Sequence, residues 1–141
     1  MDEEDASSEE VDEAEEALAG CSGEGCNGQD PGLMGCEADA VTIASSTIRS
    51  SGGLVVGTIA IRKSAACNAL WARASTSSGT AYILSTITRN SPYATAQGAS
   101  PTPVSALRSP MVGVWPGATY TANGSTGPSY GYYPNFGTVS K

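Results

Sequence analysis

Residues 54–63 read LVVGTIAIRK, and this stretch decides the fold class. Large apolar residues alternate with smaller or polar ones, so Val55, Ile59 and Ile61 fall on one face of an extended chain. β-Branched residues dominate the stretch, and such residues favour strands over helices. We therefore predict a β-strand that turns one face toward a core.

The preceding stretch, residues 40–49 (AVTIASSTIR), has the same β-branched character. Its candidates for the core are Val41, Ile43 and Ile48. Residues 50–53 (SSGG) separate the two stretches and consist of the residue types that tight turns prefer. Together the three segments predict a β-hairpin.

Two further stretches predict strands by the same argument. Residues 69–76 (ALWARAST) contain Trp71, which we expect in the core, and residues 81–89 (AYILSTITR) place Ile83 and Ile87 on one face. Each is followed or preceded by Ser, Gly or Thr residues that suit turns.

The rest of the chain carries weaker signals. Residues 90–110 are rich in Ser, Pro, Ala and Thr, which predicts a long surface loop with one short strand around 104–107. Residues 111–115 (MVGVW) and 118–122 (ATYTA) are the last predicted strands, joined by a Pro-Gly turn. Residues 124–141 are predicted to be an aromatic loop.

Length and composition agree with a small β domain. The chain has 141 residues, enough for one domain, with 17 glycines and 15% charged residues against roughly 25% in an ordinary domain. Turn signals recur at short intervals with no credible helix between them. We predict an all-β fold, a small disulfide-bonded antiparallel sandwich or barrel over residues 21–141, led by an acidic tail over residues 1–20.

Charge is strongly polarised along the chain. Residues 21–141 contain seven bases and four acids, a net charge of +3, whereas no base precedes Arg49. The tail holds too little apolar surface to fold alone, so we expect it to be disordered or folded by a partner. Charge alone leaves two interpretations open, a solubilising tail and a ligand for a basic protein surface. Ten acids form this predicted contact: Asp2, Glu3, Glu4, Asp5, Glu9, Glu10, Asp12, Glu13, Glu15 and Glu16.

The four cysteines are Cys21, Cys26, Cys36 and Cys67. The chain has no histidine and no Cys-x-x-Cys pair, so its spacing does not predict a zinc site. Two disulfides formed in an oxidising compartment are the favoured interpretation. Three connectivities are possible; we favour Cys36–Cys67 with Cys21–Cys26, which would tie the start of the domain to its first hairpin.

No catalytic constellation is apparent. Without histidine, the usual serine and cysteine relays lack their base, and nothing sets two of the four carboxylates of residues 21–141 apart as a glycosidase pair. No phosphate-binding loop or calcium loop has the required spacing. We predict a protein that is not an enzyme and has no cofactor, no nucleic-acid partner and no membrane span.

Candidate contacts outside the tail are Arg62, Lys63, Tyr132 and Tyr133. Tyrosines at 130, 132 and 133 with Phe136 form an aromatic cluster in the sequence. Such rings suit protein interfaces and sugar-stacking platforms, but they could equally cover the open end of a sandwich that has little Phe. Both interpretations stay open at this point.

The cysteine loop resembles the start of the YjfA family, a group of small exported bacterial domains. The resemblance rests on the run from Cys21 through Asp30-Pro31, on Gly35-Cys36, and on residues 61–64 (IRKS) with 69–73 (ALWAR). Family members usually have an aromatic residue where Lys63 stands. The similarity covers residues 21 to about 115 and includes all four cysteines.

This resemblance implies a function as well as a fold. Members of the family serve as the adaptor subunit of toxin particles that actinobacteria secrete for interbacterial competition. Their N-terminal extension docks into the helical repeats of the toxin protein, and their β domain holds a lectin subunit with a trypsin-like domain. We expect a secreted adaptor with its leader removed. Two alternatives remain: a proteinase inhibitor acting through residues 22–35, and a carbohydrate-binding module using the C-terminal tyrosines.

Overall fold

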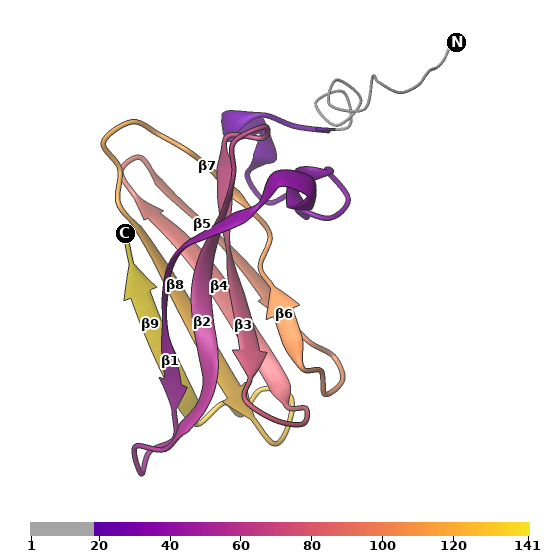
Figure 1. Cartoon of the computed structure of the whole chain (residues 1–141), viewed down its shortest axis with the longest axis vertical. Helices are drawn as coiled ribbons and strands as arrows, with labels where there is room; N and C mark the ends of the chain where they lie inside the picture. Colours follow the sequence, from indigo (N-terminus) through magenta and orange to yellow (C-terminus); the bar gives the residue numbers. More distant parts are fainter. Residues whose placement is uncertain (1–18) are drawn as a thin grey trace.

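The computed structural model describes residues 19–141, which form an antiparallel β structure with a small cap at one end (Figure 1). The cap, residues 19–40, contains two short 3-10 helices, η1 (Gly23–Cys26) and η2 (Cys36–Asp39). The predicted all-β fold is confirmed. The strands are β1 (Val41–Arg49), β2 (Val55–Ser64), β3 (Ala69–Thr76), β4 (Tyr82–Asn90), β5 (Tyr93–Ala99), β6 (Ala106–Arg108), β7 (Val112–Gly113), β8 (Tyr120–Gly127) and β9 (Asn135–Ser140).

The strands form one sheet that folds over on itself. Their order is β5-β4-β8-β9-β1-β2-β3-β6, and β7 pairs with β3 beside this path. β3 packs against β4 and β8 across the interior. Just before β4 and β6, Ala81 and Val104 exchange two backbone hydrogen bonds of 3.0 and 2.9 Å, which nearly close the sheet into a barrel.

The core is built by the alternation that the sequence shows. Ile48, Ile59 and Ile61 are fully buried, and with Ile83 and Ile87 they join the main hydrophobic cluster between the two halves of the sheet. The four predicted strands from β1 to β4 are confirmed to within one or two residues at their ends. Burial of these β-branched side chains is the chief stabilising contribution to the fold.

Two core predictions are wrong at strand ends. Val41 is 56% exposed and Val55 47% exposed, although both lie on the expected strands. Val41 is the first residue of β1. A register shift between Ile48 and Arg49 sets Val55, the first residue of β2, opposite the exposed Arg49 on the outer face of the sheet. Ile43 is partly buried and Trp71 is buried, as expected, but Trp71 packs under the cap and not in the main cluster.

The second half of the chain holds more strand than the sequence predicts. The expected loop over residues 90–110 contains β5, which pairs with β4. Leu84 lies opposite Ala99 at one end of this pairing, and Asn90 lies opposite Tyr93 at the other. β8 runs five residues beyond the predicted strand end, and β9 occupies part of the predicted C-terminal loop. The two strands pair with each other, with Thr121 opposite Ser140 at one end and Thr126 opposite Asn135 at the other. These strands are rich in Gly, Ala, Asn, Ser and Thr, residues without a strong strand signal.

The region around the cysteines contains regular structure although it is rich in glycine: within residues 21–37 lies η1, and η2 begins at Cys36. None of the helices formed by residues 19–141 has the length and apolarity needed to cross a bilayer.

Candidate functional site

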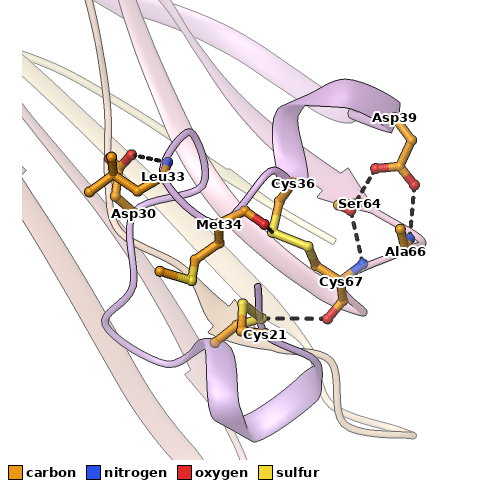
Figure 2. Close-up of a disulfide and its surroundings, with 10 residues drawn as sticks. Cys21, Asp30, Leu33, Met34, Cys36, Asp39, Ser64, Ala66 and Cys67 are labelled. Carbon is orange, nitrogen blue, oxygen red and sulfur yellow. Dashed lines mark hydrogen bonds between the residues drawn. A yellow bond between two sulfur atoms is a disulfide. The ribbon is translucent and has the colours of Figure 1, made fainter. Parts of the chain in front are cut away.

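The cap is held by two disulfides, Cys21–Cys26 and Cys36–Cys67, which confirms the favoured pairing (Figure 2). Cys67 lies in the turn between β2 and β3, so the second disulfide ties the cap to that hairpin. Cys26, Cys36 and Cys67 are fully buried together with Trp71 and Met111. The cap therefore has a small apolar core of its own.

A buried arginine joins the cap to the end of the barrel. Arg89, at the end of β4, is only 1% exposed, and its guanidinium pairs with both carboxylate oxygens of Glu24 in η1. Its Nη1 also donates to the carbonyl of Gly113 and its Nε to that of Pro92, both at 2.7 Å. The ring of Trp115 lies 5.7 Å from the guanidinium carbon, within cation–π range.

This ion pair changes the acid–base behaviour of both partners. The hydrogen bond from Arg89 holds the pKa of Glu24 below its ordinary value, and Glu24 in turn raises the pKa of Arg89. Neutralising Glu24 would leave a buried cation without its counter-charge, which is energetically costly. Glu24 and Arg89 therefore fix the position of η1 on the barrel.

A second carboxylate organises the turn that carries Cys67. The Ser64 hydroxyl donates to Asp39 at 2.6 Å and the Ala66 N–H donates to it at 2.8 Å (Figure 2). The Cys67 N–H in turn donates to the Ser64 oxygen at 3.0 Å. Desolvation raises the pKa of Asp39, but the bonds from Ser64 and Ala66 outweigh it, so the pKa lies below its ordinary value.

The outer loop of the cap presents a single large apolar side chain. Leu33 is 83% exposed, the most exposed of the large hydrophobic residues that the structure describes. Its N–H donates to Asp30 at 2.9 Å, and Asp30 accepts a bond of 3.0 Å from Arg108 of β6 (Figure 2 shows the Asp30–Leu33 contact). A side chain at Gly32 would collide with the Arg108 guanidinium. Leu33 is thus offered to solvent on a fixed loop.

The opposite end of the barrel is also apolar. Tyr130, Tyr132 and Phe136 are 65%, 59% and 52% exposed, and Leu54 in the β1–β2 turn is 71% exposed. Phe136 of β9 pairs with Arg49 of β1, whose other neighbour is Val55 of β2. We call the residues Leu54, Val55, Tyr130, Tyr132 and Phe136 the aromatic end. Because their side chains are about half exposed or more, they do not fill the core.

The four predicted body contacts do not form one surface. Arg62 lies near the cap, where it donates to the Thr42 hydroxyl at 2.8 Å, and Lys63 borders an apolar pocket with Leu70 and Tyr120. Tyr132 and the half-buried Tyr133 lie in the β8–β9 loop at the aromatic end. The two groups are separated by most of the length of β2, roughly 20 Å at 3.3 Å per residue.

The ten acidic residues of the predicted tail contact lie within residues 1–18, outside the described part of the chain. The prediction for them therefore stays a prediction.

Three residues of this region, Arg89, Glu24 and Leu33, are not among those predicted from the sequence. Arg89 continues the series Ile83, Ser85, Ile87 on the buried face of β4, so the alternation itself could have flagged a buried charge. Its partner lies 65 residues away, and no local pattern identifies it. The exposure of Leu33 likewise depends on how the cap folds.

A family model described as "Protein of unknown function (DUF2690)" matches residues 24–122. The chain belongs to this family. The matched region of the DUF2690 domain includes both Glu24 and Arg89, three of the four cysteines, and β1 through the first part of β8. No curated protein and no solved structure matches the chain.

Proposed function

We propose that this DUF2690 protein is a secreted, non-enzymatic adaptor with two contact surfaces. The observation that carries the proposal is the charge polarity: ten acids in the first sixteen residues precede a body with a net charge of +3. A dense anionic segment seeks a cationic protein surface, and long-range attraction speeds its association. Residues 2–16 are the first proposed surface.

The resemblance to the YjfA family suggests what the partners are. On that basis the acidic segment docks into a groove lined by Lys or Arg in a helical-repeat toxin protein, and the β domain holds a lectin or trypsin-like subunit. The protein would link the subunits of a particle used in competition between bacteria. Two disulfides support an oxidising, extracellular setting, where such bonds persist.

The described structure supports a binding role for the body through its two exposed apolar features. Leu33 on the fixed outer loop of the cap and the aromatic end are both available to a partner, and exposed apolar clusters of this kind often mark interaction sites. The four carboxylates of the described residues are occupied in structural bonds, Glu24 with Arg89, Asp30 and Glu37 with Arg108, and Asp39 with Ser64.

The test uses three baits in a pull-down from culture supernatant of the producing organism. They are the full chain, a chain lacking residues 2–16, and a full-length control in which the ten acids become Asn or Gln. We expect the full chain to retrieve a large secreted repeat protein in a salt-sensitive way, and both altered chains to lose it. Retention of that protein by the neutralised control would contradict the role of charge.

A second candidate function is favoured by Leu33. An exposed apolar side chain on a disulfide-tied loop is a device by which proteinase inhibitors dock rigidly. Stoichiometric inhibition of active trypsin-like enzymes by the full chain, abolished by Leu33→Ala, would favour an inhibitor. Binding of such enzymes without inhibition would favour the adaptor.

A further inference from the structure

The four cysteine sulfurs form one cluster. All four Sγ atoms lie within 4.8 Å of one another, although they come from η1, from the chain just before it, from η2 and from the β2–β3 turn. Figure 2 labels three of them, Cys21, Cys36 and Cys67. Four, nine and thirty residues separate successive cysteines, so the sequence has no Cys-x-x-Cys pair that would predict the cluster. The tertiary structure therefore assembles a set of four sulfur ligands that spacing did not predict.

We infer that this cluster binds one zinc ion as a tetrathiolate when both disulfides are reduced. Zinc bound by four thiolates has Zn–S bonds of about 2.3 Å, which places the sulfurs roughly 3.8 Å apart in a tetrahedron. The most distant sulfurs, within 4.8 Å here, need to approach by about 1 Å. The two bonded pairs, at 2.04 Å, need to separate by about 1.8 Å once their bonds are broken. Rotation of the cysteine side chains can supply changes of both sizes.

The backbone that carries the cysteines is held by bonds that do not involve sulfur–sulfur links. The Gly23 N–H donates to the Cys67 carbonyl at 2.8 Å, and the Cys36 N–H donates to the Pro31 carbonyl at 2.8 Å. The Glu24–Arg89 pair holds η1, and the Asp39–Ser64 bond holds the turn before Cys67. Reduction therefore leaves contacts that keep the four thiols facing one another.

The surroundings also suit a structural zinc site. Three of the four cysteines are fully buried, and they pack in one hydrophobic cluster with Trp71, Ala69 and Met111. A dry, closed shell of this kind is typical of structural sites, in which protein ligands fill all four positions. Zinc would replace the two disulfides as the link between the cap and the β2–β3 hairpin.

The chemistry balances with a dithiol or phosphine as the reductant. Each disulfide accepts two electrons and two protons, which breaks its S–S bond and yields two thiols while the reductant is oxidised. The four thiols then lose their protons as their thiolates bind Zn²⁺, so uptake of the metal releases protons and weakens at low pH. The inference does not depend on the proposed adaptor function.

The experiment titrates Co²⁺, as a spectroscopic substitute for zinc, into the full chain after reduction with a phosphine under anaerobic conditions. We expect one Co²⁺ per chain, with the thiolate-to-cobalt charge-transfer band and the visible bands of tetrahedral cobalt, both abolished by stoichiometric Zn²⁺. The oxidised chain should bind neither ion. The chain has a second tryptophan, Trp115, so the fluorescence of Trp71 is recorded in a Trp115→Phe variant. It reports whether the cap is folded in each state, because Trp71 packs in one buried cluster with Cys26, Cys36 and Cys67.

Two variants separate the ligands from their surroundings. Cys67→Ser should weaken Co²⁺ binding more than about tenfold. In other metal sites, losing only a residue that hydrogen-bonds to a ligand already lowers the metal affinity about 10- to 100-fold. Met34→Leu, which changes a neighbouring thioether of the cluster, should bind like the parent. Failure of the reduced chain to take up metal, folded or unfolded, would overturn the inference. So would equal binding by Cys67→Ser or by the oxidised chain.

Discussion

Arg89 is the only charged side chain that is almost wholly buried among residues 19–141. It depends on Glu24 for its counter-charge, whereas Arg108 is 41% exposed in its side chain and has two acidic partners, Asp30 and Glu37. Removing one partner from a buried pair costs far more than weakening an exposed one. The two arginines thus provide a matched comparison.

We expect Glu24→Gln to lower the melting temperature clearly, because it leaves the buried Arg89 without a negative partner. Glu37→Gln is the control: its side chain is about as exposed, 44% against 47%, but Arg108 keeps Asp30. Thermal unfolding followed by circular dichroism gives both values. Equal effects of the two substitutions would contradict the anchoring role of Glu24.

Acid should destabilise the protein through the carboxylates of the cap. Desolvation raises the pKa values of Asp30 and Asp39, but the hydrogen bonds that each accepts outweigh it, so both pKa values lie below the ordinary 3.8. The bond from Arg89 holds the pKa of Glu24 below its ordinary value of 4.5. A lowered pKa in the folded state contributes stability that is present above the ordinary value and is lost as the pH falls through the folded value. Stability should therefore decline below about pH 4.5.

Urea unfolding between pH 3 and pH 8 measures this dependence. Since the chain has no histidine, we also expect little change in the free energy of unfolding between about pH 6 and pH 8. A stability that rises as the pH falls from about 5 to 3 would show that the lowered pKa values are wrong.

Among the elements, β2 follows its sequence pattern from Gly57 to Ile61 and departs from it at its first residue. Alternation alone places Val55 and Ile59 on one face, but Val55 is 47% exposed and Ile59 is fully buried. A register shift between Ile48 and Arg49 leaves Val56 without a partner in β1 and sets Val55 opposite the exposed Arg49, on the outer face of the sheet. Local alternation therefore predicts the face of a residue only where the pairing with the next strand is regular.

Ile59→Ala should reduce the free energy of unfolding by about 2–5 kcal/mol, because it removes buried methyl groups and leaves a cavity. Val55→Ala at the exposed start of β2 is the control, and should change the free energy of unfolding by less than about 1 kcal/mol. Chemical denaturation of the two variants and the parent tests this. Comparable losses would mean that the end of β2 is buried in solution.

β5 and β9 show why strand prediction fails in the second half of the chain. β5 (YATAQGA) and β9 (NFGTVS) have few large apolar residues, and their strand conformation is supported by backbone pairing with β4 and β8. Gly137 of β9 lies so close to the backbone of Thr47 and Ile48 that a side chain would collide with it. In the sequence alone, a glycine that permits two backbones to approach closely is indistinguishable from a glycine in a turn.

At the scale of the whole molecule, the two disulfides close loops of very different length. Cys36 and Cys67 are 31 residues apart, and Cys21 and Cys26 are 5 apart. The loss of chain entropy in the unfolded state grows with loop length, and corresponds to about 3.7 and 2 kcal/mol respectively. The longer link also joins the cap to the barrel.

We expect the double variant Cys36→Ser/Cys67→Ser to lose more stability than Cys21→Ser/Cys26→Ser, by about 1.5 kcal/mol. Denaturation of the oxidised proteins measures the difference, and each double variant is the other's control. A larger loss from the short loop would mean that the cap depends on local contacts around η1 more than on its link to the hairpin.

Local pattern was sufficient for the strands β1 to β4, for the all-β class and for the polarity of charge along the chain. Every second side chain of a strand faces the core, so that information is written within a few residues. The favoured disulfide pairing is the observed one, but the sequence did not decide among the three possible connectivities.

Only the tertiary structure decided the rest. β5 and β9 exist because other strands pair with them, Arg89 meets Glu24 across 65 residues of sequence, and four cysteines spread over 47 residues bring their sulfurs within 4.8 Å. It also placed Arg62 and Lys63 at the end of the barrel away from Tyr132 and Tyr133. Such contacts join distant segments, and a period of two residues along the chain contains no information about them.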